Sequence, residues 1–253
     1  MNDGRQQLEQ MLAARVMVLR DSLLRLRLGD AMALHDVRVA VRRLRASLAP
    51  WRDRRGFRSL RRPLRELARA MAGSGRLRDR EVQQQGLREL LSPAAATAMT
   101  VTTALRPAPD VPDSLLARLN RRLARIWRDQ DADDLIAVRD AHARRLLFRI
   151  QCALGQPALL LQLPDAIHVL RLDCKHLRYL IESLEAPALP ALRAAQQVLG
   201  DLRDLDLLRV ALAEAGSLTA AASARLRQRR AHLVQLAGNA LQDLDGLSDA
   251  DLS

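Results

Sequence analysis

The stretch that decides the fold is His35-Asp36-Val37-Arg38-Val39-Ala40-Val41-Arg42-Arg43-Leu44-Arg45. On a helix, at about 100° per residue, four of its positions fall within an arc of roughly 80°. These positions are His35, Arg38, Arg42 and Arg45. Apolar residues, among them Val37, Val41 and Leu44, lie on the opposite side of the same wheel. The stretch therefore predicts a helix that buries one face and displays a basic stripe on the other.

The pattern returns 133 residues later as His168-x-x-Arg171-x-x-x-Lys175-x-Leu177-Arg178. A second signature follows each copy, first as Gly75-Arg76-Leu77-Arg78-Asp79-Arg80-Glu81 and then as Gly200-Asp201-Leu202-Arg203-Asp204-Leu205-Asp206. Because the order of the two signatures is kept, we interpret the chain as an internal duplication. We interpret the second signature as a turn, in which Asp79 and Asp204 lie near helix starts and orient neighbouring arginines.

Helical periodicity extends along nearly the whole chain, and no alternating pattern typical of strands occurs. We therefore expect an all-α protein. Glycine and proline predict breaks between helices at residues 29–30, 51–57, 73–75, 92–93, 106–112, 155–164, 187–190, 200 and 216. Three prolines within residues 106–112 predict the joint between an N-terminal half, about 1–110, and a C-terminal half, about 111–253. We expect two antiparallel bundles of the four-helix type that superpose and bring both stripes to one shared basic surface.

The charge of the chain is unevenly distributed. It carries 41 basic and 29 acidic side chains, for a formal net charge of +12, and every basic residue except Lys175 is arginine. Residues 1–110 hold 22 arginines and 11 acids, whereas residues 111–253 hold 19 basic and 18 acidic residues. A GC-rich genome explains a preference for arginine over lysine but not a local excess of charge. Such an excess indicates a polyanionic partner, since arginine forks grip phosphate oxygens in bidentate fashion.

The cysteines and the chain start indicate where the protein resides. Cys152 and Cys174 lie far apart and form no CxxC pair, which favours a reducing compartment and disfavours a structural zinc site. The first ten residues are polar, and no apolar run reaches the length of a membrane-spanning helix. We expect a cytoplasmic location.

The duplicated signatures together resemble the CHAD family, the conserved histidine α-helical domain. The resemblance implies two helical bundles related by pseudo-twofold symmetry, with the basic residues of the signature helices facing a central polyphosphate-binding channel. It maps onto that surface His35, Arg38, Arg42, Arg45, His168, Arg171, Lys175 and Arg178. Position 179 is tyrosine where the first copy has Ala46, so the two stripes are not expected to be equivalent.

Other charged residues extend or support this surface. Arg62 and Arg65 share a helical face with further arginines, and we include them among the polyphosphate-binding residues, with a solvated surface as the alternative reading. Asp79 and Asp204 are expected to be supporting residues. A metal site at the signature histidines is disfavoured because each histidine lies one turn from an arginine. We therefore expect neither a metal nor a cofactor.

These patterns predict a non-catalytic protein that binds inorganic polyphosphate. A nucleic-acid-binding helical protein is the first alternative, but only five aromatic residues occur and none is interleaved with a stripe as a stacking platform. An enzyme that processes phosphate esters or polyphosphate is the third reading, because neither a phosphate loop nor a cluster of metal-binding carboxylates is present. A structural adaptor with a basic surface stays open as well.

Overall fold

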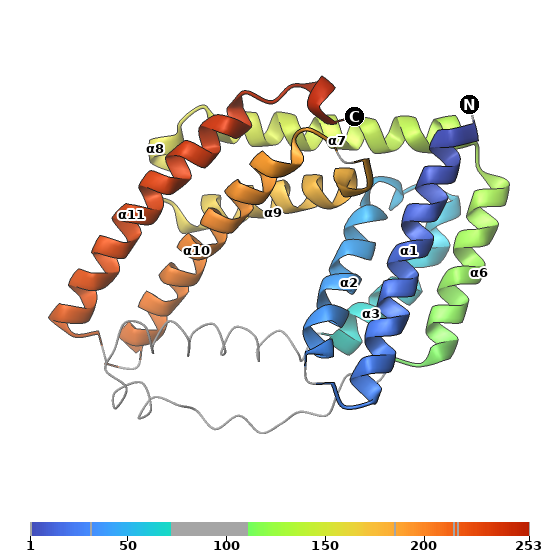
Figure 1. Ribbon diagram of the computed structural model, residues 1–253, viewed down its shortest axis with the longest axis horizontal. Coiled ribbons are helices and arrows are strands. Elements are labelled where there is room, and N and C mark those ends of the chain that lie inside the picture. The colour runs from blue at the N-terminus through green and yellow to red at the C-terminus, as the bar shows by residue number, and fades with distance from the viewer. Residues whose placement is uncertain are drawn as a thin grey trace. The chain divides into compact units, whose positions relative to one another are not determined.

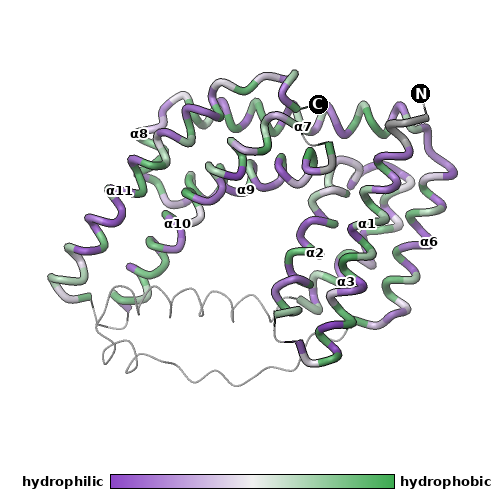
Figure 2. Tube along the Cα trace, in the orientation of Figure 1, coloured by the Kyte–Doolittle hydropathy of each residue, from purple (hydrophilic) through white to green (hydrophobic). Residues whose placement is uncertain are grey.

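The structure is a computed structural model that describes residues 2–30, 32–71, 111–184, 186–214, 216 and 218–252. Every regular element within these residues is a helix, and none of them is a strand (Figure 1). The prediction of an all-α protein is confirmed. Hydrophobic and hydrophilic residues alternate along the helices in Figure 2, as expected of helices that bury one face.

The described residues divide into two compact units, with the boundary inside helix α7 (Ala132–Leu154). The first unit comprises residues 2–71 and 111–143, and the second comprises residues 144–252. This boundary differs from the one expected near residue 110. Residues 111–143 pack with the first unit because Val111, Leu119 and Ile126 belong to its apolar core.

The first unit is built from α1 (Asn2–Arg27), α2 (Ala33–Ser47), α3 (Arg61–Met71), α6 (Asp113–Asp129) and the first part of α7. Two short 3-10 helices, η1 (Ala49–Trp51) and η2 (Gly56–Leu60), connect α2 to α3. The helices α1 and α2 pack along each other through residues such as Leu12, Leu19 and Leu44, which are fully buried.

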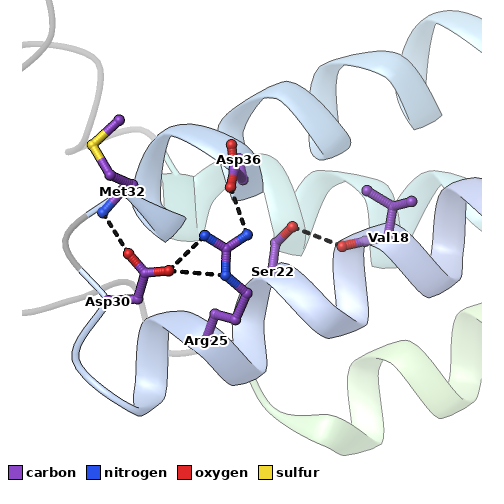
Figure 3. A network of polar contacts seen from close by, with 6 residues as sticks. All are labelled: Val18, Ser22, Arg25, Asp30, Met32 and Asp36. Atoms are coloured by element: carbon purple, nitrogen blue, oxygen red, sulfur yellow. Dashed lines mark hydrogen bonds and ion pairs between the residues drawn. The ribbon is translucent and has the colours of Figure 1, made fainter.

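A polar network fixes the turn between α1 and α2 (Figure 3). Gly29 has a φ of 87°, a left-handed conformation that glycine adopts without strain. The Arg25 guanidinium donates to Asp30 and, at 2.9 Å, to Asp36 in the first turn of α2. The other carboxylate oxygen of Asp30 accepts from the Met32 amide at 2.9 Å. This network sets the direction in which α2 leaves the turn.

The core of the first unit contains a buried aromatic pair. Trp51 stacks on Phe57 with ring centroids 5.4 Å apart, and the Trp51 indole donates to the Leu135 carbonyl at 3.0 Å. Beside it, the Arg54 guanidinium pairs with both carboxylate oxygens of Asp134. These bonds attach the start of α7 to the segment between α2 and α3.

The second unit contains the rest of α7, α8 (Pro157–Leu160), α9 (Pro164–Ile181), α10 (Leu189–Glu214) and α11 (Ala220–Asp245). Short 3-10 helices follow α9 and α11, namely η4 (Glu182–Leu184) and η5 (Asp249–Leu252). The helix α10 packs against both α9 and α11. Leu208 and Leu212 of α10 meet Leu226 of α11 in a small apolar cluster.

Two ion pairs hold the helices of the second unit together. Asp206 of α10 is buried and accepts from Arg230 of α11 at 3.2 Å, while the same guanidinium donates to the Leu161 carbonyl at 2.8 Å. Asp173 of α9 pairs with Arg149 of α7 at 2.9 Å. Burial raises the pKa of Asp173, and the nearby Arg149 opposes that rise.

The structure corrects the interpretation of the second signature as a turn. Residues 200–206 lie inside the continuous helix α10, so Gly200 is not a break and Asp204 is not near a helix start. Gly75 and Asp79 of the first copy lie outside the described residues, as do the breaks expected at 73–75 and 92–93.

Candidate anion-binding site

The basic stripe of α2 lies on the solvent side of its helix. His35, Arg42 and Arg45 are exposed, and Arg38 is half-buried. The residues predicted for the opposite face are buried, with Val37 and Leu44 at 0% exposure. The helix therefore buries the apolar face and displays the basic one, as the residue spacing predicted. We call the set His35, Arg38, Arg42 and Arg45 the α2 stripe.

No described carboxylate pairs with Arg42 or Arg45. The Arg42 Nε atom donates to the Arg38 carbonyl at 3.2 Å, a bond within the same helix that involves no acid. The acid nearest in sequence, Asp36, is bound by Arg25 of α1. Asp36 therefore already has a cationic partner in Arg25 and does not neutralise Arg42 or Arg45.

The corresponding residues of α9, His168, Arg171, Lys175 and Arg178, form the α9 stripe and are partly embedded. The Arg178 side chain is 12% exposed; its Nε atom donates to Gln196 at 2.9 Å and its Nη1 atom lies 3.4 Å from Glu182. Its guanidinium carbon also lies 4.5 Å from the centroid of the Tyr179 ring. Lys175 is buried, with its Nζ atom 5.9 Å from the same ring. Tyr179, which replaces the Ala46 of the first copy, therefore gives the cations of the α9 stripe an aromatic neighbour that the α2 stripe lacks at this position.

The other two members of the α9 stripe are half-buried, and each holds a polar atom without a hydrogen bond. The Nδ1 atom of His168 and the Nε atom of Arg171 are both buried and have no hydrogen-bond partner among the described residues. Burial lowers the pKa of His168, and the cations Arg203, Arg171 and Lys175 lower it further. The carboxylate of Asp165 has the opposite effect and raises this pKa. Unsatisfied buried polar atoms are uncommon in folded proteins.

Arg203 of α10 is a candidate residue that the sequence analysis did not select. It is half-buried, and its positive charge lowers the pKa of His168, as do the charges of Arg171 and Lys175. A signal for it was present, because Arg203 occupies the arginine position of the repeated G-x-L-R-D signature. Because that signature was interpreted as a turn, Arg203 was not placed on α10, the helix that packs against α9.

Arg62 and Arg65 lie exposed on the first turns of α3. Arg62 pairs with Glu66 at 2.9 Å, and Glu66 also accepts from Arg118 of α6 at 2.6 Å. These two cations hold the pKa of Glu66 below its ordinary value. No described acid pairs with Arg65, whereas Arg62 has an acidic partner in Glu66. Asp204 is half-buried on α10, and Asp79 lies outside the described residues.

The described residues lack two further features. No group of three or more His, Cys, Asp or Glu side chains within the described part of the chain could hold a metal ion. None of the described helices combines the length and the apolar character needed to cross a membrane.

Each of the two helical units carries a stripe of histidine and basic residues on one helix. The protein is therefore an all-helical protein with basic helix faces. The chain belongs to the CHAD domain family, whose model matches residues 4–213. The match includes both α2 and α9, so the resemblance seen in the two signatures is confirmed. Membership of this family is consistent with polyphosphate binding at the family level. No curated protein and no solved structure matched the chain.

Proposed function

We propose that this protein binds inorganic polyphosphate and does not convert it chemically. The observation that carries the proposal is the α2 stripe, whose Arg42 and Arg45 are exposed and pair with no described acid. From His35 to Arg45 the stripe extends about 15 Å along the helix, at about 1.5 Å per residue. A surface of that length suits an extended chain of phosphates better than a single small anion.

The α9 stripe contributes a second set of cations in this proposal. Lys175 and Arg178 lie against Tyr179, and Arg178 also bonds to Gln196 and Glu182, so these two side chains lose less conformational freedom when they bind a ligand. We propose that both stripes bind the same polymer. A ligand that engages both stripes at once gains from each contact, so affinity rises with chain length until the surface is spanned.

Binding without catalysis is part of the proposal because the stripes offer cations and histidine but no acidic cluster. A phosphoryl-transfer site positions metal ions with carboxylates, or the phosphate with a glycine-rich loop. We further propose a cytoplasmic location, with association with polyphosphate granules as an option within it.

A competition series tests the ligand. Long-chain polyphosphate, short oligophosphates and duplex DNA would each displace one labelled polyphosphate at two salt concentrations. We expect long chains to compete best and orthophosphate to compete poorly, with affinity falling steeply as salt rises because bound counterions are released. If duplex DNA competes as well as long-chain polyphosphate at both salt concentrations, the nucleic-acid alternative replaces this proposal.

A matched pair of double variants tests the site. Arg42→Ala with Arg45→Ala removes two charges from the α2 stripe, and Arg121→Ala with Arg125→Ala removes two exposed charges from α6 of the same unit. We expect the first pair to weaken long-chain binding strongly and to flatten its salt dependence by about one unit for each lost phosphate contact. Equal losses of affinity in the two pairs would show that total charge, rather than position, determines binding.

A further inference from the structure

Arg171 of α9 packs directly against α10 at Gly200. A Cβ atom placed on Gly200 would lie 3.3 Å from the Arg171 Nε atom and 3.7 Å from its Nη2 atom. Because Gly200 has no side chain, the Arg171 guanidinium can lie close to the backbone of α10. The carboxyl of Asp201 lies near Arg171, and burial raises its pKa while Gln197, Arg229 and Arg171 lower it.

The packing register places Arg203 opposite His168. The helices α9 and α10 are joined by a short connection, run in opposite directions and pack against each other (Figure 1). One turn back along α9 from Arg171 is His168, and one turn forward along α10 from Gly200 is Arg203. We call His168, Arg171 and Arg203 the α9–α10 cluster.

The cluster has unused hydrogen-bonding capacity. Neither the His168 Nδ1 atom nor the Arg171 Nε atom has a hydrogen-bond partner among the described residues, although both atoms are buried. Leaving a buried polar group without a partner destabilises the folded state. A ligand with several acceptor oxygens would satisfy both atoms, provided that each can donate a hydrogen. His168 donates from both ring nitrogens only when it is protonated.

The charges around His168 are mostly positive. Arg203 faces it from α10, and Arg171 and Lys175 lie on its own helix together with one acid, Asp165. Elsewhere in the second unit, Arg149 binds Asp173 and Arg230 binds Asp206. Burial and these cations lower the pKa of His168, so near neutral pH the unbound imidazole is neutral.

We propose that the α9–α10 cluster binds one phosphate group of the polymer together with one proton, which His168 takes up on binding. This inference rests on the proposed function and adds a regulation of the same site. The phosphate charge offsets Arg171 and Arg203, and its oxygens accept from the protonated imidazole. The covalent structure of the ligand is unchanged, and the proton comes from solvent.

The direction of the pH dependence follows from these charges. The pKa of His168 is lowered in the unbound protein, and a bound anion raises it because it favours the charged form. Between the two pKa values binding therefore takes up a proton, and affinity rises as the pH falls. For a full proton the change approaches about tenfold per pH unit. Below the pKa of the unbound state affinity levels off, because His168 is already protonated.

Calorimetry measures the proton directly. Long-chain polyphosphate would be titrated into the full chain in two buffers of equal pH and ionic strength but different ionisation enthalpy, from about pH 5 to pH 8. We expect the heats to differ between buffers by an amount that corresponds to uptake of up to one proton. His168→Asn should abolish this difference, whereas His232→Asn, at an exposed position on α11, should leave it unchanged.

Magnetic resonance of the His168 imidazole gives a second measurement that needs no variant of this residue. We expect its pKa to rise when long-chain polyphosphate binds and, in the unbound protein, to rise in Arg203→Gln. Tight binding with equal heats in both buffers, or with an unchanged His168 pKa, would overturn this inference while the proposed function stands. Absence of polyphosphate binding at every pH would overturn the proposed function itself.

Discussion

The α2 and α9 stripes share the spacing of their basic residues but differ in what surrounds them. On α2 the cations Arg42 and Arg45 are exposed and pair with no described acid. On α9 the cation at the last position of the stripe, Arg178, is 12% exposed and bonds to Gln196. The comparison shows that a repeated sequence pattern places basic residues on one face of each helix. The neighbouring residues then determine whether a cation is exposed, as Arg45 is, or embedded and hydrogen-bonded, as Arg178 is.

The residue after each stripe accounts for part of the difference. Position 46 is alanine, which offers no surface on which a guanidinium can stack. Position 179 is tyrosine, whose buried ring lies beneath Arg178 and near Lys175. A ring in that place adds packing and cation–π attraction, so the α9 stripe belongs partly to the core of its unit.

Removing the ring is the change with the largest expected effect on this comparison. Tyr179→Ala should lower the free energy of unfolding by about 3 kcal/mol or more, as other buried aromatic truncations do. Urea unfolding followed by circular dichroism measures the loss. Tyr179→Phe retains the ring and is the control that should keep most of the stability. A loss below about 1 kcal/mol in Tyr179→Ala would mean that the ring does not support the α9 stripe.

Single arginine truncations should separate the two stripes next. Arg178→Ala removes a largely buried, hydrogen-bonded cation and should lower the free energy of unfolding by about 1–3 kcal/mol. Arg45→Ala should change it by no more than about 0.5 kcal/mol because the side chain is exposed.

Affinity for long-chain polyphosphate should decrease in both truncations. If Arg45→Ala destabilises the fold as much as Arg178→Ala does, the expected difference between the exposed Arg45 and the embedded Arg178 does not exist. Equilibrium unfolding and polyphosphate titration on the same protein samples give both quantities.

The smallest effect is expected from a single methyl group at Gly200. Gly200→Ala should keep or slightly raise the free energy of unfolding, since alanine is favoured over glycine by about 1 kcal/mol inside a helix. The new Cβ atom would press on the Arg171 guanidinium at 3.3 Å, so polyphosphate affinity should fall by about two- to tenfold.

Gly238 of α11 provides the matched control for that substitution. A Cβ atom there would meet nothing within 4 Å, so Gly238→Ala should stabilise the helix without changing the affinity. If both alanine variants bind polyphosphate as tightly as the unmodified chain, Gly200 does not position Arg171.

The local periodicity of the sequence was sufficient to predict the helices and the faces of α2. Val37 and Leu44 are buried and Arg42 is exposed, as the helical wheel requires. Local signals failed at Gly200, because glycine was interpreted as a helix break. In the structure α10 continues through this glycine, and Arg171 from another helix occupies the space beside it.

The boundary of the units could not be predicted from local signals either. Prolines within residues 106–112 indicated a joint between two halves. The apolar faces of α6 and of the start of α7 instead pack into the first unit, through residues such as Leu119 and Leu135. Tertiary packing determines which apolar helix faces meet, and local sequence signals do not predict this pairing.

The hydrogen bond from Trp51 to the Leu135 carbonyl affects how the chain folds while the ribosome synthesises it from its N-terminus. It spans 84 positions, and the core around it combines residues from both sides of that interval. Closing so long a loop costs entropy before the buried contacts form, which slows folding. On the ribosome, α1 to α3 emerge with an incomplete core, and the first unit finishes folding only after residue 135 has left the exit tunnel. Until then the nascent chain presents apolar surface of the kind that chaperones bind.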